Sequence, residues 1–214
     1  MRVEVWTDIA CPWCYVGRAR FSQGLAAFAH RDEVEVIPRS FELNPQAANG
    51  VVPIIDAVAA QYGRTREQQV AREEQAADMA REVGLDFRIG GRVFGNTFDV
   101  HRLIHFAKQH GRQVELTDLA FRANFAEERS VYDRETQVSL AVEAGLDAAQ
   151  ARGVLDNPEA FAAEVRADER LASDLGVSGV PFFVLDRSYA VNGVQSAGMF
   201  TQALEKAWED RPAP

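Results

Sequence analysis

The sequence predicts an α/β fold in which a mixed sheet is interrupted by an all-helical block. Strand-like alternation of apolar and polar residues opens the chain and returns only after residue 181. Between residues 53 and 175 the chain is rich in Ala, Glu, Arg and Gln, with almost no strand signal. We therefore expect residues 1–50 and 176–214 to form the sheet domain and residues 51–175 an inserted helical subdomain.

Composition places the chain among ordinary soluble globular proteins. Hydrophobic residues make up 47% and charged residues 26% of the 214 residues. The net charge of −9 repels phosphate backbones and anionic lipid surfaces, so we expect no nucleic-acid or membrane partner. No apolar run is long enough to span a membrane, and the N-terminus lacks the apolar core of a secretory signal. These observations predict a cytoplasmic protein.

The first part of the chain reads as strand, helix and strand. Alternation from Arg2 to Ile9 predicts the first strand, and a helix follows to about His30. The second strand is expected from Val34 to Leu43. Because Pro38 removes one backbone donor, this strand should lie at the edge of the sheet.

Turn and cap signals divide the rest of the chain. A polar loop covers residues 44–50, a capping box at Thr65-x-x-Gln68 opens a helix to about Val83, and a glycine-rich loop covers residues 88–96. Further helices are expected near 98–110, 117–128 and 134–144, and another from Asn157 to about Leu175. A hairpin over 182–191 and a helix over 198–208 end the predicted fold, and residues 211–214 read as a frayed tail.

Two cysteines, Cys11 and Cys14, carry the strongest chemical signal. They are the only cysteines of the chain and lie between the first strand and the first helix. Unpaired N–H groups and the dipole at a helix N-terminus favour a thiolate, which predicts a lowered pKa for Cys11. Cys14 lies one turn further along, so it can resolve a mixed disulfide formed at Cys11. This pattern predicts a redox couple, without giving the direction of electron flow.

Two other interpretations of the cysteines are weaker. They could be ordinary core residues, although Pro12 and Trp13 between them and the strand-to-helix context argue against this. They could also bind zinc together with His101 and His105, which are spaced i, i+4 on a predicted helix. Nothing in the sequence brings that helix to Cys11. We therefore expect neither a metal nor a cofactor.

Several other residues allow two interpretations. Pro181 precedes a predicted strand and could be either a trans turn proline or a cis proline. Trp6 is expected to serve packing, while Asp8 is either an exposed acid at a strand end or a proton acceptor for Cys14. Asn96 and Thr97 could cap a helix or line a cleft. The residues alone give no role for His101.

Four segments together resemble the DsbA-like thioredoxin-fold proteins, most closely their cytoplasmic FrnE-type subgroup. The resemblance implies a thioredoxin-like fold with sheet order of about 2-1-3-4, a helical insertion after the second strand, and a cis Pro181 beside the cysteines. It implies a thiol–disulfide oxidoreductase in which Cys11 and Cys14 are catalytic, acting on a protein or small molecule that carries a disulfide or thiol, with a cellular thiol reductant or oxidant as redox partner. The implied substrate contacts are Pro12, Trp13, Val180 and Pro181. The segments are residues 11–17, 96–102, 178–184 and 191–195.

Two alternatives remain open beside this resemblance. The group of 2-hydroxychromene-2-carboxylate isomerases and kappa-class glutathione transferases shares the fold, binds glutathione and usually has a serine in the place of Cys11. A non-enzymatic, chaperone-like binding module would use an apolar groove between the two subdomains. The presence of both Cys11 and Cys14 favours dithiol chemistry.

Overall fold

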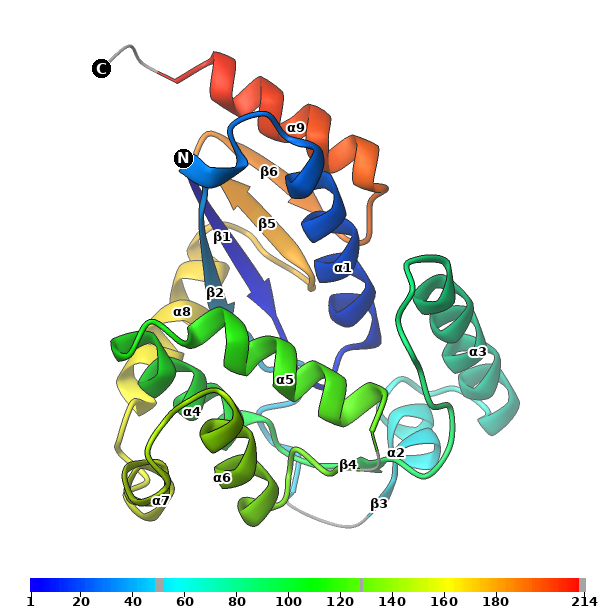
Figure 1. Ribbon diagram of the computed structural model, residues 1–214. Coiled ribbons are helices and arrows are strands. Elements are labelled where there is room, and N and C mark those ends of the chain that lie inside the picture. Colours follow the sequence, from blue (N-terminus) through cyan, green and yellow to red (C-terminus); the bar gives the residue numbers. More distant parts are fainter. Residues whose placement is uncertain (49–51, 128, 212–214) are drawn as a thin grey trace.

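A computed structural model describes residues 1–48, 52–127 and 129–211 (Figure 1). Asn49 and Gly50 of the predicted polar loop and the last three residues of the predicted tail lie outside the described residues. The main sheet has the order β2-β1-β5-β6, in which β1 and β2 are parallel and the other pairs antiparallel. The predicted mixed sheet and its strand order are therefore confirmed. Its strands are β1 (Arg2–Thr7), β2 (Glu35–Ser40), β5 (Phe182–Leu185) and β6 (Tyr189–Asn192).

Strand β1 is buried on both faces because helices cover both sides of the sheet. Val3 and Val5 share a core cluster with α1 (Pro12–Ala27) and α9 (Ala197–Glu209). Trp6, on the opposite face, packs with residues of α8 (Ala162–Asp174), which agrees with its predicted packing role. The three layers leave the C-terminal end of β1, where the cysteine turn begins, pointing into the helical half of the molecule (Figure 1).

Strand β2 lies at the edge of the sheet, as Pro38 predicts. Pro38 pairs with Val5 on the inner side of the strand. The Pro38 carbonyl accepts a hydrogen bond of 3.1 Å from Nε2 of Gln113, which belongs to α5 (Gln113–Phe125). The edge is therefore covered by an inserted helix, and a proline is tolerated there because it has no N–H to leave unpaired.

The segment between β2 and β5 is mainly helical. Thr65 and Gln68 form the predicted capping box at the start of α3. The prediction lacks three features of this segment, namely the helices α2 and α7 and the short β3–β4 ladder. Helix α5 begins four residues earlier than predicted. The division of the chain into two domains at residues 50 and 175 stays a prediction. The described elements are β3 (Val52–Pro53), α2 (Ile54–Gln61), α3 (Arg66–Glu82), β4 (Val93–Phe94), α4 (Phe98–Gln109), α5, α6 (Arg134–Glu143), α7 (Ala148–Asp156) and α8.

Helix α8 begins at Ala162, so the prediction of a helix start at Asn157 is wrong. The Asn157 side chain accepts from the Glu159 N–H and closes a turn instead of a helix. The buried Arg102 guanidinium donates to the carbonyl oxygens of Val154 and Asn157 at 2.7 and 2.8 Å. Because a tertiary contact takes up these carbonyl groups, the chain forms a turn between α7 and α8.

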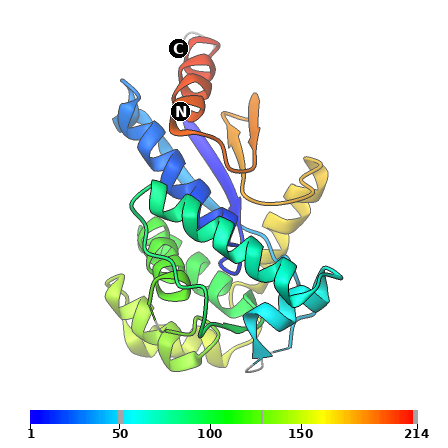
Figure 2. The same cartoon turned by 90° about the vertical axis from the view of Figure 1, so that its right-hand side faces the viewer.

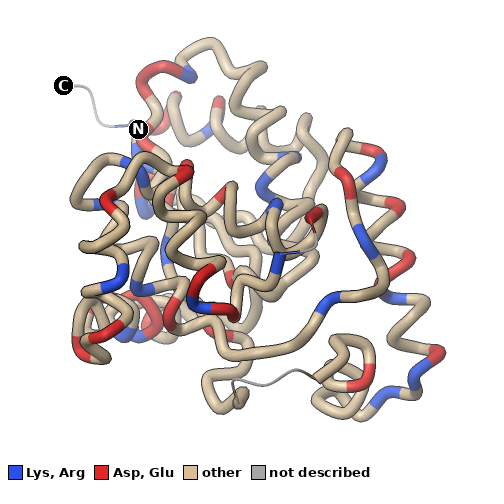
Figure 3. The backbone as a smooth tube through the Cα atoms, turned by 60° about the horizontal axis from the view of Figure 1, so that its bottom comes forward, with Lys and Arg blue, Asp and Glu red and all other residues tan. Residues whose placement is uncertain are grey.

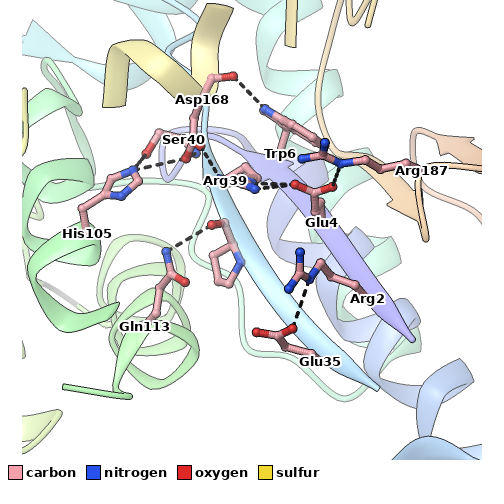
Figure 4. A network of polar contacts seen from close by, with 11 residues as sticks. Arg2, Glu4, Trp6, Glu35, Arg39, Ser40, His105, Gln113, Asp168 and Arg187 are labelled. Carbon is pink, nitrogen blue, oxygen red and sulfur yellow. Dashed lines mark hydrogen bonds and ion pairs between the residues drawn. The ribbon is translucent and has the colours of Figure 1, made fainter. Parts of the chain in front are cut away.

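A polar network joins the inserted helices to the back of the sheet (Figure 4). Asp168 of α8 accepts hydrogen bonds from Arg39 Nη1 at 2.8 Å and from the Ser40 N–H at 2.9 Å. His105 of α4 places its Nε2 atom 3.2 Å from Asp168 Oδ2. Arg39 also pairs with the buried carboxylate of Glu4 on β1. The network fixes α4 and α8 against the sheet through buried and hydrogen-bonded ion pairs.

Helix α3 lies alongside α1 (Figures 1 and 2). Arg20 of α1 and Glu82 of α3 form an ion pair of 2.9 Å across this contact. Acidic and basic residues are interspersed along the chain in Figure 3. Within the described ranges, the helices are too short or too polar to cross a membrane.

Candidate active site

The two cysteines lie at the start of α1. Cys11 is the N-cap residue, and Pro12 occupies the first turn, where its missing N–H costs no helical hydrogen bond. The turn is held by hydrogen bonds of 3.0 Å from the Cys11 N–H to the Asp8 carbonyl and 3.1 Å from the Cys14 N–H to the Cys11 carbonyl. Cys11 and Cys14 are free thiols that lie 3.5 Å apart. The sequence predicts that Cys14 lies one turn after Cys11 and within disulfide reach of it, and the structure has this arrangement.

Both cysteines belong to the core of the inserted helices and not to the core of the sheet. Cys11 is 2% exposed and Cys14 is fully buried. Burial raises the pKa of the Cys14 thiol well above its ordinary value, and the hydrogen bond and charge of Cys11 raise it further. Cys14 is therefore the cysteine that stays protonated, and Cys11 is the cysteine that borders the cavity.

The loop before β5 faces Cys11. The Cys11 thiol donates to the Val180 carbonyl oxygen at 3.7 Å. The Val180–Pro181 peptide bond is cis, the geometry that the family resemblance implies. The Pro181 ring packs against Gly17 of α1, where a Cβ atom would lie only 2.7 Å from Pro181 Cγ. Glycine at position 17 thus allows the loop to approach α1 closely.

A cavity of about 320 Å³ opens next to Cys11. The cysteine turn and the Ser178–Val180 loop line one side of it, and α2 and α3 of the inserted segment line the other. Of the predicted substrate contacts, Pro12, Trp13 and Val180 line the cavity, whereas Pro181 is not among the lining residues. Residues that the sequence did not single out also line it, among them Asn44, Gln61, Tyr62, Arg64, Gln69 and Arg72.

The cavity is lined by two arginines, Arg64 and Arg72, and by the carboxylates of Asp8 and Glu73, of which Glu73 pairs with Arg92. Arg64 stacks over the Tyr62 ring at 4.6 Å and donates to Gln69, and Arg72 donates to Gln75. Among the described residues, neither Arg64 nor Arg72 forms an ion pair with a carboxylate. The polar helix surface at 65–82 looks solvated in the sequence, so no local signal distinguishes these two arginines from their neighbours.

The remaining candidates lie in or beside the cavity, which Asp8 and Thr97 line. Asp8 is 1% exposed, so its interpretation as an exposed acid is wrong. Thr97 lines the cavity and its side chain does not cap α4, while Asn96 Oδ1 accepts from the Phe98 N–H at 2.7 Å. His101 of α4 lies against Asp8, with 3.7 Å between Nε2 and Oδ1.

The alternative zinc site does not assemble. His101 and His105 share one helix, but they face Asp8 and Asp168 respectively. In the part of the chain that the structure describes, no three residues of the types that ligate metals come together. The two cysteines and the two histidines therefore do not form a tetrahedral set.

Residues 2–205 match the model of the DSBA-like thioredoxin domain family. A solved structure from Streptomyces coelicolor, described as a probable DsbA oxidoreductase, is similar over the whole chain. The identity is 56%, the coverage is 100% of this chain and 92% of that one, and the TM-score is 0.95.

Two more distant structures share the fold. The cytosolic disulfide reductase DsbM from Pseudomonas aeruginosa, solved with GSH, is 17% identical, with 97% of this chain and 95% of that chain covered and a TM-score of 0.63. A 2-hydroxychromene-2-carboxylate isomerase is 13% identical, with 98% and 97% covered and a TM-score of 0.74.

Proposed function

The chain belongs to the DSBA-like thioredoxin domain family, and from this premise we propose that it is a thiol–disulfide oxidoreductase that uses Cys11 and Cys14. One observation carries the proposal. Two free thiols lie 3.5 Å apart at the start of a helix, and the first of them borders a cavity. A cytoplasmic setting, in which cellular thiols keep such a pair reduced, belongs to the same proposal.

The proposed reaction is a two-step exchange. The Cys11 thiolate attacks one sulfur of a substrate disulfide, which forms a mixed disulfide and releases the first substrate thiolate. Cys14 then loses its proton and attacks the Cys11 sulfur, which forms the Cys11–Cys14 disulfide and releases the second substrate thiolate. The cysteine pair loses two electrons and the substrate gains them. The same steps in reverse oxidise a dithiol.

The cavity favours a small, anionic substrate. Cys11 is almost inaccessible except through the cavity, whose size suits a small molecule or a short peptide segment. Arg64 and Arg72 could bind carboxylate groups of such a substrate. The neighbour solved with GSH supports this substrate class, because GSH is a thiol that carries two carboxylates. Val180 and Pro181 would hold the reacting sulfur next to Cys11.

Two cysteine variants test the exchange. With Cys11→Ser, reduction of glutathione disulfide and of insulin should fall to background. With Cys14→Ser, the first step should still occur and the protein should accumulate as a mixed disulfide, visible by intact mass spectrometry. Unchanged turnover in Cys11→Ser would exclude the proposal, and a chaperone-like binding activity that survives in both variants would favour a binding module.

Three arginine variants test the substrate class. Arg64→Gln and Arg72→Gln should each raise the KM for glutathione disulfide about three- to fivefold, as expected for a partly exposed ion pair. The KM for uncharged hydroxyethyl disulfide should not change. Arg81→Gln is the matched control, since Arg81 lies on α3 like Arg72 but pairs with Asp78 and does not line the cavity. Equal effects on the two disulfides would contradict the anionic substrate class.

A glutathione-binding activity without dithiol chemistry is the second candidate, favoured by the same arginines. Such a protein would bind glutathione equally well when both cysteines are replaced by serine. Calorimetric titration of glutathione into that double variant, beside the turnover assays, separates the two functions.

A further inference from the structure

A chain of side-chain hydrogen bonds runs through the wall of the cavity from Arg64 to Arg92. Arg64 Nη1 donates to the side-chain oxygen of Gln69 at 3.0 Å, and the amide nitrogen of Gln69 donates to Glu73 Oε1 at 3.3 Å. The other carboxylate oxygen of Glu73 accepts from Arg92. Arg64, Gln69 and Glu73 line the cavity. We call these four residues the cavity-wall network.

Three members of the cavity-wall network are buried. Gln69 and Glu73 are each 3% exposed, and Arg92 is 9% exposed. Removing an ion pair from water costs about as much free energy as the attraction of the charges returns, so stability alone does not explain the buried Glu73–Arg92 pair. The network ends at Arg64, which faces the cavity, and we therefore examine what the network does for this arginine.

The amide of Gln69 joins two charged groups without adding a charge. An amide oxygen only accepts and an amide nitrogen only donates, so the contacts to Arg64 and Glu73 together fix the orientation of the amide. Arg92 balances the charge of Glu73, whereas Arg64 is held by an amide and not by a carboxylate. The positive charge of Arg64 therefore stays available for an anion in the cavity.

Both ends of the network are anchored by aromatic rings. The Arg92 guanidinium lies over the Phe125 ring at 4.7 Å, and this ring stacks on Tyr15 of α1 at 5.2 Å. At the other end, the guanidinium of Arg64 lies over the Tyr62 ring at 4.6 Å. Because α1 is also the helix that begins at the cysteines, the network sets the position of Arg64 relative to the reacting sulfur.

Arg72 lines the same cavity without such support. Its side chain is exposed, and its Nη1 atom donates to Gln75 of the same helix at 3.4 Å. The cavity thus has one arginine that a buried network holds and one that lies at the solvent. The two residues allow a direct comparison of a directed contact with charge alone.

We propose that Gln69 and Glu73 are positioning residues that hold Arg64 in the orientation in which it binds a carboxylate of the substrate. This inference rests on the proposed function and assigns the directed recognition of the anion to Arg64, while Arg72 adds only charge. The physical reason is entropic: a long side chain that is ordered before the substrate arrives loses less conformational freedom on binding.

The test measures how Gln69 and Arg64 act together on the KM for glutathione disulfide. Gln69→Met keeps the length of the side chain but removes the amide that holds Arg64. It should raise this KM about two- to threefold, less than removal of the arginine itself, because the substrate must then order Arg64. The kcat for glutathione disulfide and the KM for uncharged hydroxyethyl disulfide should not change.

The decisive comparison places Gln69→Met in two backgrounds. Added to Arg64→Gln, it should cause no further rise in the KM for glutathione disulfide. Added to Arg72→Gln, it should raise this KM by the same factor as in the wild type, because independent sites add. An equal rise in both backgrounds would mean that Gln69 contacts the substrate itself, and this result would overturn the inference.

Glu73→Gln gives a second variant in which positioning and simple electrostatics predict opposite signs. Loss of a negative charge from the cavity wall would by itself favour an anion and lower the KM. Positioning predicts a rise of about twofold that disappears in the Arg64→Gln background. Glu74→Gln is the matched control, since it makes the same change at an exposed position of α3 and should leave the KM unchanged.

The outcomes separate this inference from the proposed function. If Arg64→Gln raises the KM but neither Gln69→Met nor Glu73→Gln does, only the positioning role is wrong. If Gln69→Met does not fold, Glu73→Gln decides, and a lowered KM in that variant overturns the inference. A wild type that reduces neither glutathione disulfide nor hydroxyethyl disulfide would instead overturn the proposed function.

Discussion

Two histidines lie one helical turn apart on α4, and each faces a buried aspartate in a different region of the molecule. His105 faces Asp168 behind the sheet, at 3.2 Å, and His101 faces Asp8 behind the cysteine turn, at 3.7 Å. The first pair is part of a network in which every group has hydrogen-bond partners (Figure 4). In the second pair the ring nitrogen has none among the described residues.

The difference shows how similar residue pairs acquire different tasks. The His105–Asp168 pair shares hydrogen bonds with Ser40 and Arg39, so moving α4 or α8 away from the sheet would break several bonds at once. It therefore suits a structural role that joins the insertion to the sheet. The His101–Asp8 pair contributes less to holding the fold together, because no hydrogen bond joins the two side chains. We expect the stability of the fold to depend more on the first pair than on the second.

The largest expected effect on stability is that of Asp168→Ala. It leaves Arg39 without one carboxylate partner and the Ser40 N–H without an acceptor, so the free energy of unfolding should fall by about 3–5 kcal/mol. Asp8→Ala should cost clearly less. Urea denaturation of both variants measures the difference, and equal losses would remove the distinction between the two regions.

The same substitution, histidine to leucine, can be compared at the two positions. His105→Leu removes a hydrogen bond to a carboxylate and should lower the free energy of unfolding by about 1.5–3 kcal/mol. His101→Leu removes no hydrogen bond and replaces an unpaired polar atom by an apolar group, so its effect should stay within about 1 kcal/mol. The opposite order of the denaturation midpoints would contradict our comparison.

The acid dependence of stability should also come from the first region. Burial opposes ionisation of Asp168, but the hydrogen bonds from His105 and the Ser40 N–H and the charge of Arg39 outweigh burial and hold the pKa of Asp168 below its ordinary value of 3.8. The ionised Asp168 therefore contributes its full share of the free energy of unfolding above pH 3.8, the pKa of the unfolded chain. This share is lost as the pH falls through the lower pKa of Asp168 in the folded state.

The contribution amounts to about 1.4 kcal/mol for each unit by which the folded and unfolded pKa values differ. Chemical denaturation between pH 2 and pH 5 should show a shallower decline for Asp168→Asn than for the wild type. Parallel curves for the two proteins would show that the pKa of Asp168 is the same in the folded and unfolded states.

The smallest expected effect is that of Trp6→Phe. Nε1 of Trp6 donates to the backbone carbonyl of Asp168 at 3.0 Å, and phenylalanine keeps most of the packing but not this bond. The free energy of unfolding should fall by about 1 kcal/mol. The rate of glutathione disulfide reduction should not change, and a slower rate would show that the two regions are coupled.

Local signals predicted the parts of the fold whose causes are local. The capping box at Thr65 and Gln68 was found because side-chain and backbone groups three residues apart satisfy each other. Helix α7 has a similar signal, since the Asp147 side chain caps it through the Gln150 N–H, and this signal was overlooked. Helix α2 has eight residues and no side-chain cap, so its stability comes from packing and leaves little trace in the sequence.

Some residues of the candidate site could be predicted from the sequence and others could not. Cys11, Cys14 and Pro181 stand out because their residue types are rare and their context is specific. Arg64 and Arg72 do not stand out, because an arginine that lines a cavity and one on a solvated helix face have the same local sequence. Only the packing of α3 near the cysteine turn distinguishes them.

Local sequence patterns were enough to predict the alternating first strand, the edge position of Pro38, the cysteine turn at a helix start and the helical character of the insertion. Each follows from residues close together in the chain. The burial of Asp8, and its contact with His101 and not with His105, could not be predicted in this way. The reason is physical: the burial and the partners of a polar group depend on which distant segments pack around it, and α4 meets Asp8 and α8 only after the chain has folded.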